Sequence, residues 1–141
     1  MIRKYEPWDS DSVMEIWLDA NCSAHDFIDR GYFEGAFETV KDMIPRAEVY
    51  VCEENDQIKG FIGLKEGYVE GLFVKPACQG NGIGKELLDR AKQLREVLML
   101  SVYRKNERAF NFYRRESFNV SELSVDEATG ETEITMEWSR S

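Results

Sequence analysis

Cysteine, histidine and long apolar runs are scarce in this sequence, and each scarcity excludes a class of protein. The three cysteines are odd in number and show no Cys-x-x-Cys or similar spacing, which argues against a disulfide framework and against a zinc site. No apolar run approaches the roughly 20 residues needed to cross a bilayer. The start, Met1–Tyr5, leads into charged residues rather than into the core of a signal peptide. We therefore expect a cytoplasmic protein with reduced thiols, no bound metal and no membrane partner.

Basic residues are also few. The chain has 18 Lys and Arg residues against 27 Asp and Glu residues, so its net charge is −9. Because a nucleic-acid-binding protein needs a basic surface, we expect no nucleic-acid partner. An acidic surface suits cationic small molecules or basic peptides, or serves only solubility. With 141 residues, 43% of them apolar, and no repeat or linker, residues 1–141 are predicted to form a single domain.

The sequence is organised around a glycine-rich stretch between a predicted strand and a predicted helix. The apolar run Leu72–Val74 ends before Pro76, which cannot donate to a sheet ladder. A helical pattern of apolar residues begins after three glycines at alternate positions, which are Gly80, Gly82 and Gly84. A glycine turn at a helix N-terminus presents free backbone N–H groups at the positive end of the helix dipole, so we expect a phosphate-bearing ligand.

The spacing of the glycines distinguishes between the known phosphate loops. The Walker motif needs a glycine where this chain has Gln79 and a Ser or Thr where it has Glu86, and the dinucleotide motif needs Gly-x-Gly-x-x-Gly, so neither fits. The pattern Gln79-x-x-Gly82-x-Gly84 instead resembles the acetyl-CoA pyrophosphate loop of the GNAT (Gcn5-related) N-acetyltransferases. A second stretch, Asn106–Phe118, resembles the family motif Asn-x-x-Ala-x-x-Phe-Tyr-x-x-x-Gly-Phe. Two motifs at the expected separation favour this family.

The order of the predicted elements indicates a mixed α/β fold. Seven strands are predicted, at Ile2–Glu6, Glu48–Glu53, Ile58–Lys65, Tyr68–Val74, Val97–Tyr103, Phe118–Val125 and Glu131–Trp138. Four helices are predicted, from Asp9–Asp11 to Ala20 with a turn from Asn21, from Asp29 to Ile44, from the glycine loop to Glu96, and from Asn106 to Arg115. The resemblance implies the GNAT fold, a central, mostly antiparallel seven-stranded sheet with a splayed parallel pair, flanked by about four helices. The splayed strands correspond to Tyr68–Val74 and Val97–Tyr103.

The resemblance implies acetyl-CoA as the co-substrate. Its acetyl group would pass to a primary amine of a small molecule or a peptide, directly within a ternary complex. Cofactor binding is assigned to the strand end, the glycine loop and the second motif, namely Leu72, Phe73, Val74, Gln79, Gly80, Asn81, Gly82, Ile83, Gly84, Lys85, Asn106 and Tyr113. Asn106 also suits a helix N-cap, and the two roles are compatible. The loop lacks the Arg or Lys common in relatives, so pyrophosphate binding rests on backbone amides with help from Lys85, and Ser117 replaces the usual glycine before Phe118.

Acetyl transfer to an amine needs an acid for the leaving thiolate and a base for the amine. Tyr113 corresponds to the family's general acid, and the alternative is a core aromatic whose hydroxyl finds a structural partner. Some peptide-modifying relatives have a glutamate that acts as the general base at the position where this chain has Ser101. Glu70 is the better candidate, because strand alternation would turn it to the same face as Leu72; the alternative is a solvated carboxylate. His25, a water relay and an amine that arrives neutral are the other possibilities.

The acceptor side is expected at the two N-terminal helices and the final strand pair, where the family varies. We predict that it is lined by His25, Phe27 and Tyr32. Nearby acids suit a cationic acceptor, namely Asp26, Asp29 and Glu34. Phe33 and Phe37 are interpreted as helix-packing residues. The acids of the last hairpin are interpreted as a solvated face, and they are Glu122, Asp126, Glu127, Glu131, Glu133 and Glu137.

Two other functions fit the same pattern. One is a non-catalytic acyl-CoA sensor that keeps the cofactor cleft but carries out no transfer. The other is an interaction domain in which the glycine loop is only structural. Monomer and homodimer are equally compatible with the sequence, and the acceptor amine is not identified by it.

Overall fold

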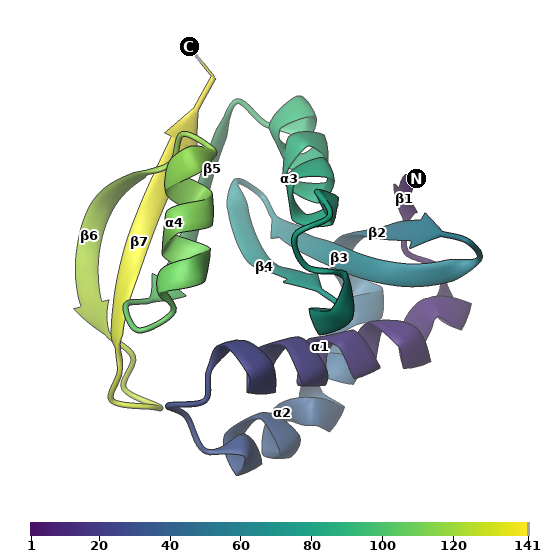
Figure 1. Cartoon of the computed structure of the whole chain (residues 1–141), viewed down its shortest axis with the longest axis horizontal. Helices are drawn as coiled ribbons and strands as arrows, with labels where there is room; N and C mark the ends of the chain where they lie inside the picture. Colours follow the sequence, from purple (N-terminus) through teal and green to yellow (C-terminus); the bar gives the residue numbers. More distant parts are fainter. Residues whose placement is uncertain (141) are drawn as a thin grey trace.

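A seven-stranded sheet runs through the molecule in the order β1-β2-β3-β4-β5-β7-β6 (Figure 1). The computed structural model describes residues 1–140. All neighbouring strands are antiparallel except β4 and β5, which are parallel, as the family resemblance implies. The strands are β1 (Ile2–Lys4), β2 (Glu48–Glu54), β3 (Gln57–Lys65), β4 (Tyr68–Val74), β5 (Val97–Tyr103), β6 (Asn119–Val125) and β7 (Thr132–Ser139).

Four α-helices and three short 3-10 turns accompany the sheet within residues 1–140. The helices are α1 (Ser10–Ala24), α2 (Arg30–Met43), α3 (Ile83–Leu94) and α4 (Glu107–Arg115), and the 3-10 turns are η1 (Pro7–Asp9), η2 (Ile44–Arg46) and η3 (Pro76–Cys78). In this part of the chain, no helix is both long enough and apolar enough to cross a membrane.

Helix α1 continues past the turn that the sequence predicts at Asn21. Asn21 is buried, and its side-chain amide donates to the carbonyl oxygen of Trp17 at 2.8 Å. The polar side chain is therefore satisfied within the helix and does not end it. The prediction of a turn from Asn21 is wrong, and the helix is capped at His25 instead.

Helices cover both faces of β2, β3 and β4 (Figure 1). Helices α1 and α2 pack on one face around Trp17 and Phe61. Helix α3 packs on the other face around Leu88, and α4 joins the same core through Tyr113. Because strand residues alternate, Phe61 and its neighbour Ile62 enter different cores. Burial on both faces fixes the register of the central strands, since a slip by one residue would exchange the two sets of side chains.

The parallel strands β4 and β5 separate soon after they begin. Within residues 1–140 their ladder contains the single pair Tyr68 and Met99. Strand β5, in contrast, pairs with β7 from Val97 to Tyr103. Beyond Tyr68, the edge of β4 that faces β5 therefore carries backbone N–H and C=O groups without sheet partners. The predicted splayed pair is confirmed.

An irregularity in the ladder between β3 and β4 changes the direction of Glu70. The pairing steps from Gly71 directly to Val69, so Glu70 has no partner across the ladder. Val69 and Leu72 both pack in the core on the α3 side, although they are three residues apart. Glu70 lies next to Val69 in the strand and points to the opposite face. The expectation that Glu70 shares the face of Leu72 is therefore wrong.

Candidate active site

A groove of about 710 Å³ lies between the end of β4, the loop before α3, helix α4 and the end of α1. His25, from the loop after α1, also contributes to its wall. Asn81, Glu70, Phe27 and Tyr32 do not line it. The structure thus brings two distant motifs to one cavity, which is lined by Leu72, Phe73, Val74, Gln79, Gly80, Gly82, Ile83, Gly84, Lys85, Asn106 and Tyr113.

Two glycines shape the loop before α3. Gly80 and Gly82 have φ values of +86° and +82°, in the left-handed region that side-chain-bearing residues rarely adopt. Gly82 is the N-cap of α3 and provides no side-chain acceptor, and the first helical bond runs from the amide of Glu86 to the carbonyl of Gly82 at 3.0 Å. The N–H groups of Ile83–Lys85 therefore have no acceptor within the helix. At the positive end of the helix dipole, they form a site that can bind a pyrophosphate.

Lys85 lies at this loop and is already paired. Its Nζ atom is 3.2 Å from Oε1 of Glu116 and 3.4 Å from Oδ2 of Asp89. Glu116 is the main reason that the pKa of Lys85 is raised above its ordinary value. The ammonium group is thus positively charged at neutral pH, but part of its charge is balanced before a ligand arrives.

Tyr113 is buried at the wall of the groove. Its side chain is 7% exposed, and its ring meets those of Phe112 and Phe118 edge-on, with centroids 5.1 Å and 5.5 Å away. Burial raises the pKa of its hydroxyl far above the usual range, so the group is protonated at neutral pH. Within residues 1–140, this hydroxyl neither donates a hydrogen bond nor accepts one. The alternative of a structural partner thus finds no support among these residues.

Asn106 connects helix α4 to the loop after α1. Its Oδ1 accepts a hydrogen bond from the amide of Ala109 at 3.2 Å, and its Nδ2 lies 3.2 Å from Nε2 of His25. Since Oδ1 is the acceptor, Nδ2 donates, and Nε2 of His25 must be the unprotonated nitrogen of a neutral ring. Its Nδ1 carries the hydrogen and is buried without a partner in residues 1–140. Burial lowers the pKa of His25, which further favours the neutral form.

Comparison with protein families identifies the family to which the chain belongs. The family model of the acetyltransferase (GNAT) domain matches residues 45–120, which include the glycine loop and helix α4. This chain belongs to the GNAT acetyltransferase family. The resemblance predicted from the two sequence motifs is confirmed.

Two relatives and two solved structures show how far the likeness extends. Peptidyl-lysine N-acetyltransferase YiaC of Escherichia coli K12 is 31% identical over 98% of this chain and 96% of its own length. YjaB of the same strain, also named a peptidyl-lysine N-acetyltransferase, is 29% identical over 85% of this chain and 82% of its own. The apo form of Escherichia coli YjaB superposes with a TM-score of 0.87 at 27% identity, covering 98% and 96% of the two chains. PaiA N-acetyltransferase from Thermoplasma acidophilum in complex with coenzyme A shares the fold, with a TM-score of 0.86 at 23% identity over 99% and 98% of the chains.

The predicted acceptor residues of this GNAT lie in one aromatic cluster beside the groove. The ring of His25 stacks on Phe33 at 5.9 Å and meets Phe27 and Tyr103 edge-on at 5.7 Å and 5.1 Å. Tyr32 contacts Phe33 at 5.2 Å and is 41% exposed. Phe33 is buried against α1, as expected of a packing residue, while the cluster extends from the groove wall to the surface.

Glu70, the strand candidate for the base, does not reach the groove directly, and Ser101, at the position where some relatives have a glutamate, is held by β7. Glu70 is exposed and lies outside the groove lining. Ser101 shares a hydrogen bond with Thr135 of β7, with 3.3 Å between their oxygen atoms. A base role for Glu70 thus requires a relaying water molecule.

The last hairpin of this GNAT is less uniform than its sequence suggests. Asp126 accepts a hydrogen bond from the hydroxyl of Tyr103 at 2.6 Å, which lowers the pKa of its carboxyl. Glu133 is half-buried, and burial followed by the charge of Asp126 raises the pKa of its carboxyl. The interpretation as a solvated face is therefore wrong for these two residues. The sequence does contain an indication of this, because the apolar residues Ile134 and Met136 set the alternation of β7 and place Glu133 on the face opposite the core.

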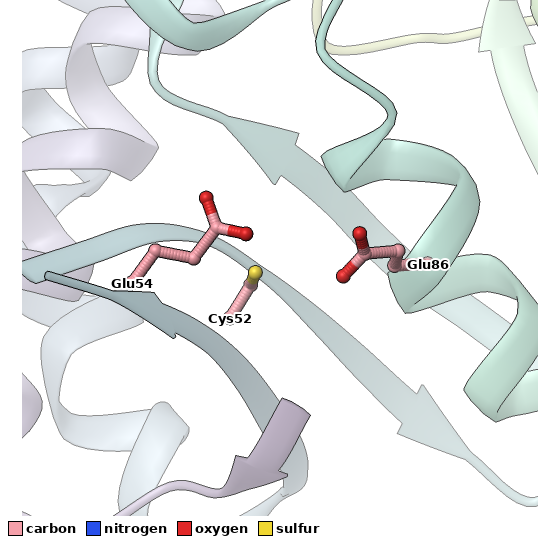
Figure 2. Close-up of side chains that lie close together, drawn as sticks. All are labelled: Cys52, Glu54 and Glu86. Carbon is pink, nitrogen blue, oxygen red and sulfur yellow. The ribbon is translucent and has the colours of Figure 1, made fainter. Parts of the chain in front are cut away.

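Three side chains of types that can coordinate a metal ion lie close together elsewhere in this GNAT. The Sγ atom of Cys52 and carboxylate oxygens of Glu54 and Glu86 all lie within 4.8 Å of one another (Figure 2). Cys52 is buried, and burial raises the pKa of its thiol, while both glutamates are exposed. None of the three residues lines the groove, so the cluster is separate from the candidate active site.

Proposed function

We propose that this GNAT transfers the acetyl group of acetyl-CoA to the side-chain amine of a lysine in a peptide or protein. One observation carries the catalytic part of the proposal: Tyr113 is buried at the groove wall with a protonated hydroxyl that has no partner in residues 1–140. The choice of acceptor is supported by relatives named peptidyl-lysine N-acetyltransferases, at 31% and 29% identity. The free cysteines Cys22, Cys52 and Cys78 agree with a cytoplasmic site of action.

The groove suits acetyl-CoA on physical grounds. The N–H groups of Ile83–Lys85 would hold the pyrophosphate, because they have no acceptor of their own and open positions at Gly80 and Gly82 let the backbone approach it. The unpaired backbone edge at Leu72–Val74 would bind the pantetheine arm and the thioester carbonyl. Asn106 would contact the cofactor from the start of α4.

The chemistry follows from this placement. When bound, acetyl-CoA supplies an activated acetyl carbon and a thiolate leaving group. A backbone N–H at the free edge of β4 would stabilise negative charge on the carbonyl oxygen as the acceptor nitrogen adds. The hydroxyl of Tyr113 would then give its proton to the departing sulfur. The amine gives up its own proton to water, and Glu70 is proposed to receive it through that water.

Transfer to a peptide tests the proposal directly. We would incubate the protein with acetyl-CoA and a peptide that has a blocked N-terminus and one internal lysine, and measure free-thiol release together with the peptide mass. A peptide with arginine in place of lysine is the matched control, and an unblocked peptide without lysine tests N-terminal transfer. Thiol release and one added acetyl group with the lysine peptide alone are expected. Acetyl-CoA binding without transfer to either amine would contradict the proposal and favour the sensor alternative.

A further inference from the structure

The half-sheet formed by β5, β7 and β6 has a polar face next to the aromatic cluster. Tyr103 of β5 pairs with Glu133 of β7, and Ser101 pairs with Thr135. Directly paired residues of antiparallel strands share a face, so these four side chains lie together. The opposite face belongs to the core of α3 and α4 through Leu100, Val102, Ile134 and Met136. Glu133 is thus on the side of the sheet where Tyr103 meets His25.

Glu133 is, in the part of the chain that the structure describes, the one half-buried acid at this end of the hairpin whose carboxylate has no partner, since Glu127 is exposed. Glu131 is paired with Lys105 at 3.2 Å, and Asp126 accepts a hydrogen bond from Tyr103 at 2.6 Å. No salt bridge or hydrogen bond within residues 1–140 satisfies Glu133, although it is half-buried. A half-buried, unpaired carboxylate next to Asp126 lowers the stability of the folded protein, since both burial and the second negative charge oppose its ionisation.

The surroundings of Glu133 are suited to an alkyl ammonium group. The ring of Tyr103 meets that of Phe27 at 5.8 Å. Tyr32 is 41% exposed, and the pKa of its hydroxyl is raised by partial burial and, to a smaller extent, by the nearby charges of Asp126 and Glu133. Aromatic rings and a carboxylate together bind a cation with an aliphatic stem. His25 connects this place to the groove, because it lines the groove and contacts Tyr103.

We infer that Glu133, flanked by Tyr32 and Tyr103, binds a positively charged side chain of the acceptor peptide and makes this GNAT selective for lysines in basic surroundings. This inference rests on the proposed function, since it describes the acceptor end of the same groove. It assigns Glu133 to peptide selection, while Tyr113 acts on the leaving group. The net charge of −9 adds long-range attraction for the same class of peptide.

The experiment compares two peptides that differ only in the charge beside one acetylatable lysine. In one peptide the lysine is flanked by arginines, which supply charge but accept no acetyl group, and in the other by glutamines. At saturating acetyl-CoA, the wild type is expected to have a lower KM for the arginine-flanked peptide. Glu133→Gln is expected to raise that KM about tenfold or more, as loss of one charge-assisted hydrogen bond implies. The KM for the glutamine-flanked peptide should change little.

Glu137→Gln is the matched control. Glu137 lies on the same strand and face and has the same charge, but it pairs with Met99 at the far end of β5. Its substitution should leave both KM values unchanged. A damaged fold would not explain the Glu133→Gln result, because the melting temperature of that variant should equal or exceed that of the wild type.

Binding of the two peptides, measured by fluorescence anisotropy without turnover, separates the inference from the proposed function. If binding depends on the flanking charge and this dependence is lost in Glu133→Gln, but no variant transfers acetyl groups, the subsite is supported and the proposed function is overturned. Acetyl transfer with the same peptide preference in wild type and Glu133→Gln would overturn the subsite and retain the function. Absence of both binding preference and transfer would overturn both.

Discussion

At the scale of single residues, Tyr113 is the side chain on which the proposed chemistry depends. Tyr113→Phe removes one oxygen atom and keeps the packing against Phe112 and Phe118. We predict that kcat falls by about 100-fold or more, as expected for loss of a positioned proton donor, while the Kd of acetyl-CoA stays the same. Steady-state kinetics with the lysine peptide and a titration with acetyl-CoA measure the two quantities.

Tyr50→Phe is the control for this substitution. Tyr50 is also buried, but its hydroxyl donates to Glu48 at 2.7 Å and lies outside the groove. Its removal should lower the free energy of unfolding by about 1 kcal/mol and leave kcat unchanged. Equal kcat values for Tyr113→Phe and the wild type would remove Tyr113 from the mechanism.

His25 makes the stability of the protein depend on pH near neutrality. Its pKa in the folded state is lowered below the ordinary value of about 6.5, because burial disfavours the charged ring. The unfolded chain therefore binds the proton first as the pH falls, and the free energy of unfolding should decrease below about pH 6.5 and be flat above it. Urea unfolding of the wild type and of His25→Gln, between pH 5 and 8, measures this. The free energy of unfolding of the wild type relative to His25→Gln should fall as the pH drops below about 6.5 and be constant above pH 7, and a relative stability that does not change between pH 5 and 8 would contradict the account.

The limits of sequence reasoning at this scale are seen in Glu133 and His25. A row of acids in a hairpin predicts a solvated face, because sequence alone does not show which acid is paired. The lowered pKa of His25 depends on rings from α2 and β5 and on Asn106, which meet only after folding. Tyr113 and the glycine loop could be predicted because each belongs to a short motif.

At the scale of elements, Gly60 allows β3 and β4 to approach the start of α3. A Cβ atom at Gly60 would lie 2.7 Å from the carbonyl oxygen of Phe73 and 3.2 Å from side-chain atoms of Ile83 and Leu87. Gly60→Ala should therefore lower the free energy of unfolding by about 1–3 kcal/mol. Gly35→Ala is the control, since nothing lies within 4 Å of that position in α2, and it should raise stability by about 0.5–1 kcal/mol. Urea unfolding of both variants checks the prediction, which a Gly60→Ala protein as stable as Gly35→Ala would contradict.

Most elements of this chain follow from its hydrophobic pattern, and the exceptions have local causes. The nearly continuous apolar runs of β2 and β3, the alternation in β7 and the helical period of α3 predict those elements closely. The irregularity at Glu70 escapes the pattern, because it arises from pairing with β3 and leaves the composition of β4 unchanged. The extension of α1 depends on the hydrogen bond of Asn21, which satisfies a polar residue that otherwise suggests a turn.

At the scale of the whole molecule, the groove exists because the sheet divides. Strands β1 to β4 lie between helices α1 and α2 on one face and helix α3 on the other, whereas β5, β7 and β6 pack against α4 (Figure 1). The two parts join through the short contact of β4 with β5, and the groove residues that are proposed to bind the cofactor come from both sides of this contact. The family, and with it this arrangement, could be predicted from two motifs. The acceptor could not, because it depends on loops and on a sheet face that the motifs do not include.

The most direct test of the account is a calorimetric titration with acetyl-CoA of the wild type, Gly82→Asp and Gly130→Asp. Gly82 and Gly130 both have positive φ values and open surroundings, so the two substitutions share the backbone strain and the added charge, but Gly130 lies in the last hairpin. We predict micromolar binding by the wild type and Gly130→Asp, on the order of −8 kcal/mol, and no detectable binding by Gly82→Asp. Absence of binding by the wild type, or equal affinity in Gly82→Asp, would contradict the assignment of the groove as the acetyl-CoA site.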